Sequence, residues 1–203
     1  MSTLQSIDLQ RLPFLRELFE LLNAGRHLNR LSQQRLWAEL EREQAQYEAL
    51  FAALGYTLRI DGRGFAWFHF EDASNNVSKT TRQLALLFML IFEFKADSGV
   101  HLARFTEWPI DQGFLLTLIE KNNLLLRTEH LAELEPLTQL MRTAANYGFA
   151  IADGAGWRLL PALFRYLDRF EELAQRGEPD DAALSAGDRP DSDQGDDFER
   201  DDA

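Results

Sequence analysis

The sequence predicts a mainly α-helical fold of two winged-helix units in tandem, each with a small β-hairpin wing, followed by a disordered acidic tail. Three observations predict it. The pattern Asp-Gly-x-Gly-aromatic occurs at residues 61–65 and again at 153–157. Helical periodicity precedes each copy, and the last 27 residues are acidic and poor in apolar side chains. With 203 residues and 45% hydrophobic content, the chain can bury a core.

The first unit begins with three helical patterns. Residues 12–22 carry leucine and phenylalanine at helical spacing, with Gly25 just beyond the last of them. Ser32 can cap a second helix that runs through Leu40. Residues 44–54 repeat the same apolar spacing and predict a third helix.

The two copies of the motif predict β-hairpins. Asp-Gly with a second nearby glycine supplies the positive φ angles that tight turns need. An alternating run that opens with Gly-aromatic precedes each copy, at 55–60 and 148–152, and strand-like residues follow each copy. We therefore expect one two-stranded wing at the end of each unit.

The second unit repeats the order of the first. We expect a helix at 79–95 capped by Ser78, a shorter helix near 111–121, a third at 133–147 and a final one at 161–175. The expected organisation is an N-terminal winged-helix domain (1–73), a linker (74–77), a C-terminal winged-helix domain with its terminal helix (78–176) and the tail (177–203).

The net charge of −12 is concentrated in the tail. Residues 177–203 contain eleven acidic residues and two arginines, which is a charge of −9 and leaves −3 for residues 1–176. Such a segment buries too little apolar surface to offset its ordering entropy, so we expect it to be disordered. The nearly neutral body permits a local basic patch.

The third helix of a winged-helix unit normally faces DNA. In the first unit this helix carries Glu43 and Glu48, which repel phosphate. In the second unit a polar stripe and nearby cations form the candidate DNA-binding set: Lys121, Arg127, Gln139, Arg142, Thr143, Asn146 and Arg158. Four cations support weak, sequence-independent binding, and a solvated helix face is the competing interpretation of the stripe.

Residues 84–92 are apolar all round, which an exposed amphipathic helix would not be. The helix is either central to its own unit or packs in part against the neighbouring unit or a second copy of the chain. Together with surplus aromatic residues of the first wing, it supplies the candidate interface residues. These are Phe88, Phe92, Phe94, Trp67 and Phe68.

The sequence offers no catalytic constellation. Cysteine is absent, which excludes disulfides, thiolate metal sites and a cysteine nucleophile. The four histidines show no ligand spacing, and no phosphate-binding glycine loop is present. Glu39 and Glu43, which flank Arg42, are expected to form a charged helix face. We therefore expect no enzyme, no cofactor and no metal.

The N-terminal residues show no basic segment followed by an apolar core, so we expect no signal peptide. The longest apolar run is about half of the ~20 residues that a membrane-spanning helix needs. We expect a cytoplasmic protein that does not enter the membrane.

Several stretches resemble a known family. They are Ala24-Gly25-Arg26-His27-Leu28, similar to a Gly-Arg-His-Ile stretch of MukE, then residues 47–56 (YEALFAALGY) and 64–68 (GFAWF). In order and spacing, residues 10–175 resemble the MksE family, the small subunits of the MksBEF bacterial condensin and relatives of MukE. The sequence departs from MukE before the second wing, where MukE is rich in basic residues and this chain has Ala144, Ala145 and Asn146.

The resemblance implies a non-catalytic subunit of an SMC complex, of the kite type with tandem winged-helix domains. Its implied partners are a second copy of itself, a kleisin of the MksF type, the SMC ATPase of the MksB type through that kleisin, and DNA held without sequence preference. The implied role is chromosome organisation and segregation or restriction of plasmids, close to the nucleoid. Arg26 and His27 match the family, and we expect them to form the turn that ends the first helix, with the histidine hydrogen-bonded there. The alternative hypothesis is a winged-helix transcriptional regulator.

Overall fold

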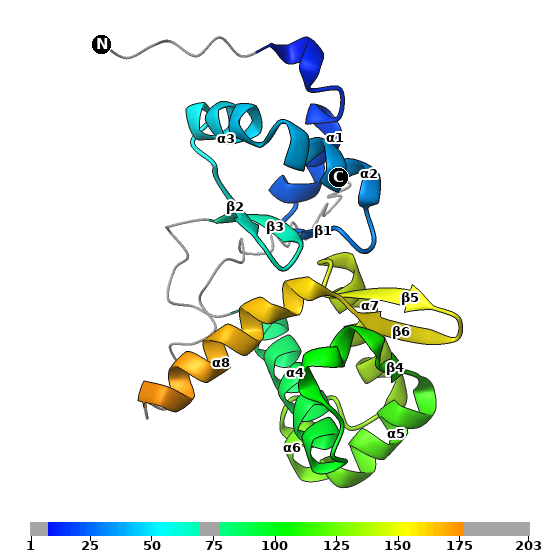
Figure 1. Ribbon diagram of the computed structural model, residues 1–203. Helices are drawn as coiled ribbons and strands as arrows, with labels where there is room; N and C mark the ends of the chain where they lie inside the picture. Colours follow the sequence, from blue (N-terminus) through cyan, green and yellow to red (C-terminus); the bar gives the residue numbers. More distant parts are fainter. Residues whose placement is uncertain (1–7, 70–77, 177–203) are drawn as a thin grey trace, which may run out of the picture.

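The computed structural model describes residues 8–69 and 78–176, which form two units of the same topology (Figure 1). The first unit contains α1 (Leu15–Asn23), β1 (Leu28–Asn29), α2 (Gln34–Arg42), α3 (Gln44–Ala53), β2 (Thr57–Asp61) and β3 (Phe65–His69). A short 3₁₀ helix, η1 (Leu9–Arg11), precedes them.

The second unit follows the same order with one extra helix. It contains α4 (Lys79–Asp97), η2 (Leu102–Glu107), β4 (Pro109–Ile110), α5 (Gln112–Lys121), α6 (Asn123–Thr128), α7 (Leu134–Asn146), β5 (Ala150–Asp153) and β6 (Gly156–Leu159). A 3₁₀ turn, η3 (Pro161–Leu163), leads into the last helix, α8 (Phe164–Arg176).

The two sheets share one strand order. The first is β1-β3-β2 and the second β4-β6-β5, and every pairing is antiparallel. In each sheet the wing hairpin is joined by a short strand that follows the first helix of the unit. The predicted mainly helical, winged-helix fold is confirmed.

Local chemistry explains several boundaries. Ser78 Oγ accepts from Thr81 N at 3.1 Å and begins α4 as predicted, and Asp111 Oδ1 accepts from Phe114 N at 2.7 Å and begins α5. The predicted cap at Ser32 is wrong, because Gln33 stands at the N-cap of α2 and makes no capping bond. Helix α6 and the two-residue strands β1 and β4 were not predicted from the sequence.

Strand β3 is shared between two hydrophobic clusters. Its Ala66 and Phe68 side chains belong to the cluster of the first unit, whereas Phe65 belongs to the cluster of the second unit and Trp67 packs against it. Successive side chains of a strand point to opposite faces, which explains the division. The first sheet is therefore packed on both faces, with the second unit against one of them.

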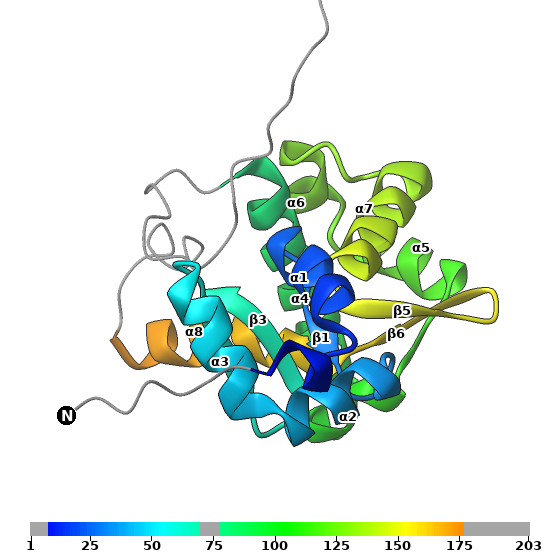
Figure 2. The same cartoon turned by 90° about the horizontal axis from the view of Figure 1, so that it is seen from above.

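Helix α8 runs beneath the first wing and beside α4, so it spans the boundary between the units (Figures 1 and 2). The β5–β6 hairpin instead extends away from the body in both views.

The predicted boundaries at 73/74 and 77/78 lie outside the described residues, as does the acidic tail. Among the described residues, no helix has the length and apolar character needed to cross a membrane.

Candidate docking and nucleic-acid surfaces

The predicted polar stripe lies on the outer face of α7. Gln139, Arg142 and Asn146 are exposed and Thr143 is half-buried. Leu137, Leu140, Met141 and Ala144 of the opposite face are buried in the second unit. The structure thus places these four polar residues on one surface, as their spacing predicts.

Acidic neighbours hold two of the candidate cations. Arg142 Nη1 lies 3.2 Å from Glu135 Oε1 and donates to Gln139 Oε1 at 3.1 Å. Arg158 Nε lies 3.3 Å from Asp153 Oδ2 in the second wing. Exposed pairs of this kind contribute about 0–1 kcal/mol, so a phosphate group can compete for either guanidinium.

The remaining candidates lie on the neighbouring helices. Lys121 ends α5, where its Nζ lies 4.3 Å from the ring centroid of Phe94, and Arg127 is exposed on α6.

Arg26 was not among the predicted residues of this surface, but it lies beside α7. Its Nε donates to the carbonyl oxygen of Asn146 at 2.7 Å, so an arginine of the first unit lies at the C-terminal end of α7. The two residues are 120 positions apart, and no local pattern indicates the contact.

The two wings have different surroundings despite their shared motif. At the tip of the first wing, Arg63 makes two hydrogen bonds to Asp168 of α8, at 2.7 and 2.5 Å, and lies over the ring of Phe164 at 4.3 Å. The hydrogen bonds to Asp168 and Asp61 raise the pKa of Arg63. In the second wing Gly154 and Ala155 are exposed. The first wing is therefore fastened to the body, and the second is accessible.

The candidate interface residues lie mostly inside the chain. Phe88 and Phe92 of α4 are buried in the second unit, and Phe68 is buried in the first. Trp67 of β3 is half-buried against the second unit, and the guanidinium carbon of Arg165 lies 4.8 Å from its ring centroid. Phe94 is also half-buried and packs edge-on against Phe114. These aromatic side chains fill the monomer and its inter-unit contact.

We call the contact of Arg26, His27 and Asn29 with residues 146–148 the seam. His27 N and Nδ1 both donate to the carbonyl oxygen of Tyr147 at 2.9 Å. Arg165 Nη1 of α8 lies 2.6 Å from His27 Nε2. Burial, and secondarily the charge of Arg165, lower the pKa of His27 to about 3. The expected turn with a hydrogen-bonded histidine is present. The partners of His27 are Tyr147 of the second unit and Arg165 of α8.

Asn29 completes the seam. Its side-chain amide donates to the carbonyl oxygens of His27 at 3.2 Å and Gly148 at 2.8 Å, and its Oδ1 accepts from Ala162 N at 3.1 Å. One buried side chain thereby satisfies backbone groups of three segments. Arg26, Asn146 and their neighbours Ala24 and Tyr147 line a shallow surface cleft beside it.

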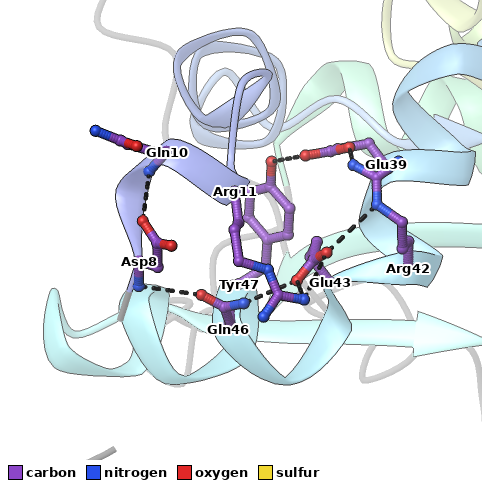
Figure 3. Close-up of polar contacts among 8 residues, drawn as sticks. All are labelled: Asp8, Gln10, Arg11, Glu39, Arg42, Glu43, Gln46 and Tyr47. Carbon is purple, nitrogen blue, oxygen red and sulfur yellow. Dashed lines mark hydrogen bonds and ion pairs between the residues drawn. The ribbon is translucent and has the colours of Figure 1, made fainter. Parts of the chain in front are cut away.

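A second polar cluster joins η1 to α2 and α3 (Figure 3). The prediction that Glu39 and Glu43 form an exposed charged face is wrong, because their relative exposures are 2% and 7%. Glu39 bonds to Arg42 and accepts from Tyr47 Oη at 3.3 Å. Burial and the charge and hydrogen bond of Glu39 raise the pKa of Tyr47.

Glu43 fastens the N-terminal turn. It accepts from Arg11 Nη2 at 3.0 Å, from Arg42 Nε at 3.3 Å and from Gln46 Nε2 at 2.8 Å (Figure 3). Burial raises the pKa of Glu43, but the bonds from Arg11 and Arg42 outweigh it and leave the pKa lowered. The hydrogen bonds of Glu39 and Glu43 thus join members of the same cluster, which is the pattern of a structural network.

The described residues contain no group of three or more metal-ligating side chains. A family model described as condensin complex protein MksE matches residues 13–171. The chain belongs to the MksE family. No curated protein matches the sequence.

The MksE match runs from the residues before α1 into α8, and so includes both units, both wings and the seam. Membership makes the chain an accessory, non-catalytic subunit of a condensin complex. The acidic tail lies beyond the matched region.

Proposed function

We propose that this MksE-family chain acts as a homodimer that binds a kleisin of the MksF type and, through it, an SMC ATPase of the MksB type. The observation that carries the proposal is the family match across both winged units. The fold supports it, because two packed units with exposed helical faces offer docking surface for protein partners.

Light scattering coupled to size-exclusion chromatography tests the assembly. The full chain alone is expected to elute with twice the mass of the 23.4 kDa protomer, and co-expression with the kleisin is expected to give a stable larger complex. A strictly monomeric chain that does not associate with the kleisin contradicts the proposal.

We further propose that the assembled complex holds DNA without sequence preference, with α7 contributing. Arg142 and its exposed neighbours lie on one surface, and the exposed second wing lies beyond them. The few cations, partly paired with Glu135 and Asp153, suit weak backbone contacts better than the reading of bases.

The salt dependence of DNA binding by the complex tests this contribution. Arg142→Ala is expected to lower the slope of log affinity against log salt by about 1, equally for unrelated sequences. Arg16→Ala is the matched control, because Arg16 is also an exposed helical arginine, on α1, and is likewise paired with a glutamate, Glu20. An unchanged slope contradicts the role of Arg142. Tight binding of one operator by the isolated chain would support the alternative of a transcriptional regulator.

The proposed setting is the cytoplasm, at the nucleoid, in chromosome segregation or in restriction of plasmids. Deleting the chromosomal gene and scoring nucleoid morphology and the retention of a small plasmid separates the two roles. Normal nucleoids with raised plasmid retention would assign the chain to plasmid restriction. Irregular nucleoids would assign it to chromosome organisation.

A further inference from the structure

The seam brings together residues that are distant in sequence and gives each of them a partner in the other unit or in α8. We propose that His27 and Asn29 are positioning residues that lock the two winged units into one body, and that the lock requires His27 as the neutral imidazole with its proton on Nδ1. This inference concerns how the chain's own halves are fixed, and it goes beyond the proposed partners.

The partners of His27 determine its protonation. The carbonyl oxygen of Tyr147 only accepts, so Nδ1 must donate to it at 2.9 Å. The guanidinium of Arg165 only donates, so Nε2 must accept at 2.6 Å. A doubly protonated ring would lose this acceptor and place a second cation against Arg165. The rings of Phe149 and Trp67, at 4.6 and 6.4 Å between centroids, surround the imidazole and offer no compensating charge.

Asn29 adds a second, uncharged fastening. Its amide joins the first unit to the turn after α7 through Gly148, and its Oδ1 holds Ala162 at the start of the segment that leads into α8. Since the side chain is fully buried, loss of the amide leaves backbone groups on both sides without this partner. The lock therefore acts on α7 and α8 together.

The two units differ at this point although their topologies match. Gly148 and Gly55 hold equivalent places before the two wings and have nearly equal φ angles of +82° and +83°. A Cβ on Gly148 would lie 2.5 Å from the carbonyl oxygen of His27, whereas a Cβ on Gly55 would meet nothing within 4 Å. The close approach is thus a property of the seam and is not inherited from the repeated fold.

The lock fixes the relative orientation of the surfaces that the chain presents to partners. It holds Arg26 against the C-terminal end of α7, beside Asn146, and together with the bonds from Arg63 to Asp168 it sets the first unit against α8. The outer face of α7 and the free second wing then keep one orientation relative to the first unit. A scaffold with a single orientation loses less entropy when it binds several partners.

Distance measurements between two spin labels test the lock in the full chain. The protein has no native cysteine, so Glu48→Cys on α3 and Glu93→Cys on α4 give one label in each unit at exposed helical positions. The expected result is one narrow distance distribution. His27→Ala with Asn29→Ala is expected to widen it at least twofold while the helical circular dichroism persists.

Matched variants separate the requirement for a neutral ring from a general loss of folding. His27→Gln keeps an uncharged donor and acceptor and is expected to preserve most of the narrow distribution, whereas His27→Lys introduces a fixed cation and is expected to widen it. His130→Asn removes an exposed histidine at a positive φ position and is expected to change nothing. A broad distribution in the parent, or a narrow one in the folded alanine variant, overturns the proposal.

Nitrogen NMR of the unmodified protein gives a readout that does not depend on how variants fold. The His27 ring is expected to show a protonated Nδ1 and an unprotonated Nε2, without titration between pH 8 and pH 5. The nitrogen signals of the exposed His101 and His130 rings, recorded in the same spectra, serve as internal references. A midpoint for His27 between pH 6 and 7, or the opposite tautomer, overturns the proposal.

Discussion

The side-chain amide of Asn29 donates a hydrogen bond of 2.8 Å to the carbonyl oxygen of Gly148, a residue 119 positions away in the chain. Around this bond the first unit lies so close to the turn after α7 that only a glycine fits there. The seam therefore couples folding of the first unit to that of the second. The contribution of the seam to the free energy of unfolding can be measured directly.

Replacing Gly148 by alanine is expected to destabilise the chain more than the same change at Gly55. Both changes place a side chain at positive φ, which costs about 1–2 kcal/mol. Only Gly148→Ala also forces a Cβ to 2.5 Å from the His27 carbonyl oxygen, for which we expect roughly 2 kcal/mol or more in addition. Urea unfolding of the two variants measures the difference, and equal losses would contradict the close contact.

Acid is expected to weaken the native state through His27. Its folded pKa is lowered to about 3, below the ordinary value of 6.5. Between these two values the unfolded chain binds a proton that the folded chain does not, so stability falls as the pH falls, by up to about 1.4 kcal/mol per pH unit. Above pH 6.5 this contribution is constant.

The pH effect is isolated by comparison with His27→Gln. Urea unfolding of both proteins at pH 7.5, 6.5 and 5.5 gives the difference in free energy of unfolding at each pH. The wild-type protein is expected to lose stability relative to the variant only between pH 6.5 and 5.5. Parallel curves across the whole range would mean that the ring takes up its proton in the folded state.

The buried carboxylate of Glu39 makes Arg42 important for stability. Arg42→Ala leaves Glu39 buried with the hydrogen bond from Tyr47 but without its ion pair, and we expect a loss of about 1–3 kcal/mol. Arg16→Ala breaks an exposed pair with Glu20 and is expected to cost less than about 0.5 kcal/mol. Thermal unfolding followed by calorimetry compares them. Equal shifts would show that Glu39 is solvated.

The bond between Arg63 and Asp168 is expected to restrain the first wing. Asp168→Ala should increase amide hydrogen exchange in the β2–β3 hairpin several-fold, with a stability loss of about 1 kcal/mol or less, because both side chains are partly exposed. The charge exchange Arg63→Asp with Asp168→Arg should restore much of the protection. Asp153→Ala, which removes the partner of Arg158 in the free wing, is the control and should leave β2–β3 unchanged.

Local patterns predicted most of the fold. The repeated Asp-Gly-x-Gly-aromatic motif located both wings, and apolar spacing located α1, α3, α4, α5, α7 and α8 to within a few residues. These features are encoded within one turn or one helical face. The strands β1 and β4 were missed because two residues give no periodicity, and their pairing with β3 and β6 is long-range.

The seam and the buried carboxylates were beyond prediction for a physical reason. His27 and Tyr147 are 120 positions apart, and the turn around His27 reads locally as an ordinary helix end. Glu39 and Glu43 have the spacing of a solvated helix face, but Arg11 of η1 covers Glu43 and Tyr47 of α3 covers Glu39. Burial of a polar group is decided by tertiary contacts that composition does not reveal.

The central claim is that this chain is an accessory subunit of a condensin complex. Affinity purification of the natively expressed, tagged chain, with its partners quantified by mass spectrometry, tests it most directly. We predict a coiled-coil SMC ATPase and its kleisin in fixed proportion to the chain. Recovery of the chain without either protein, under conditions that preserve other condensin assemblies, would contradict the account.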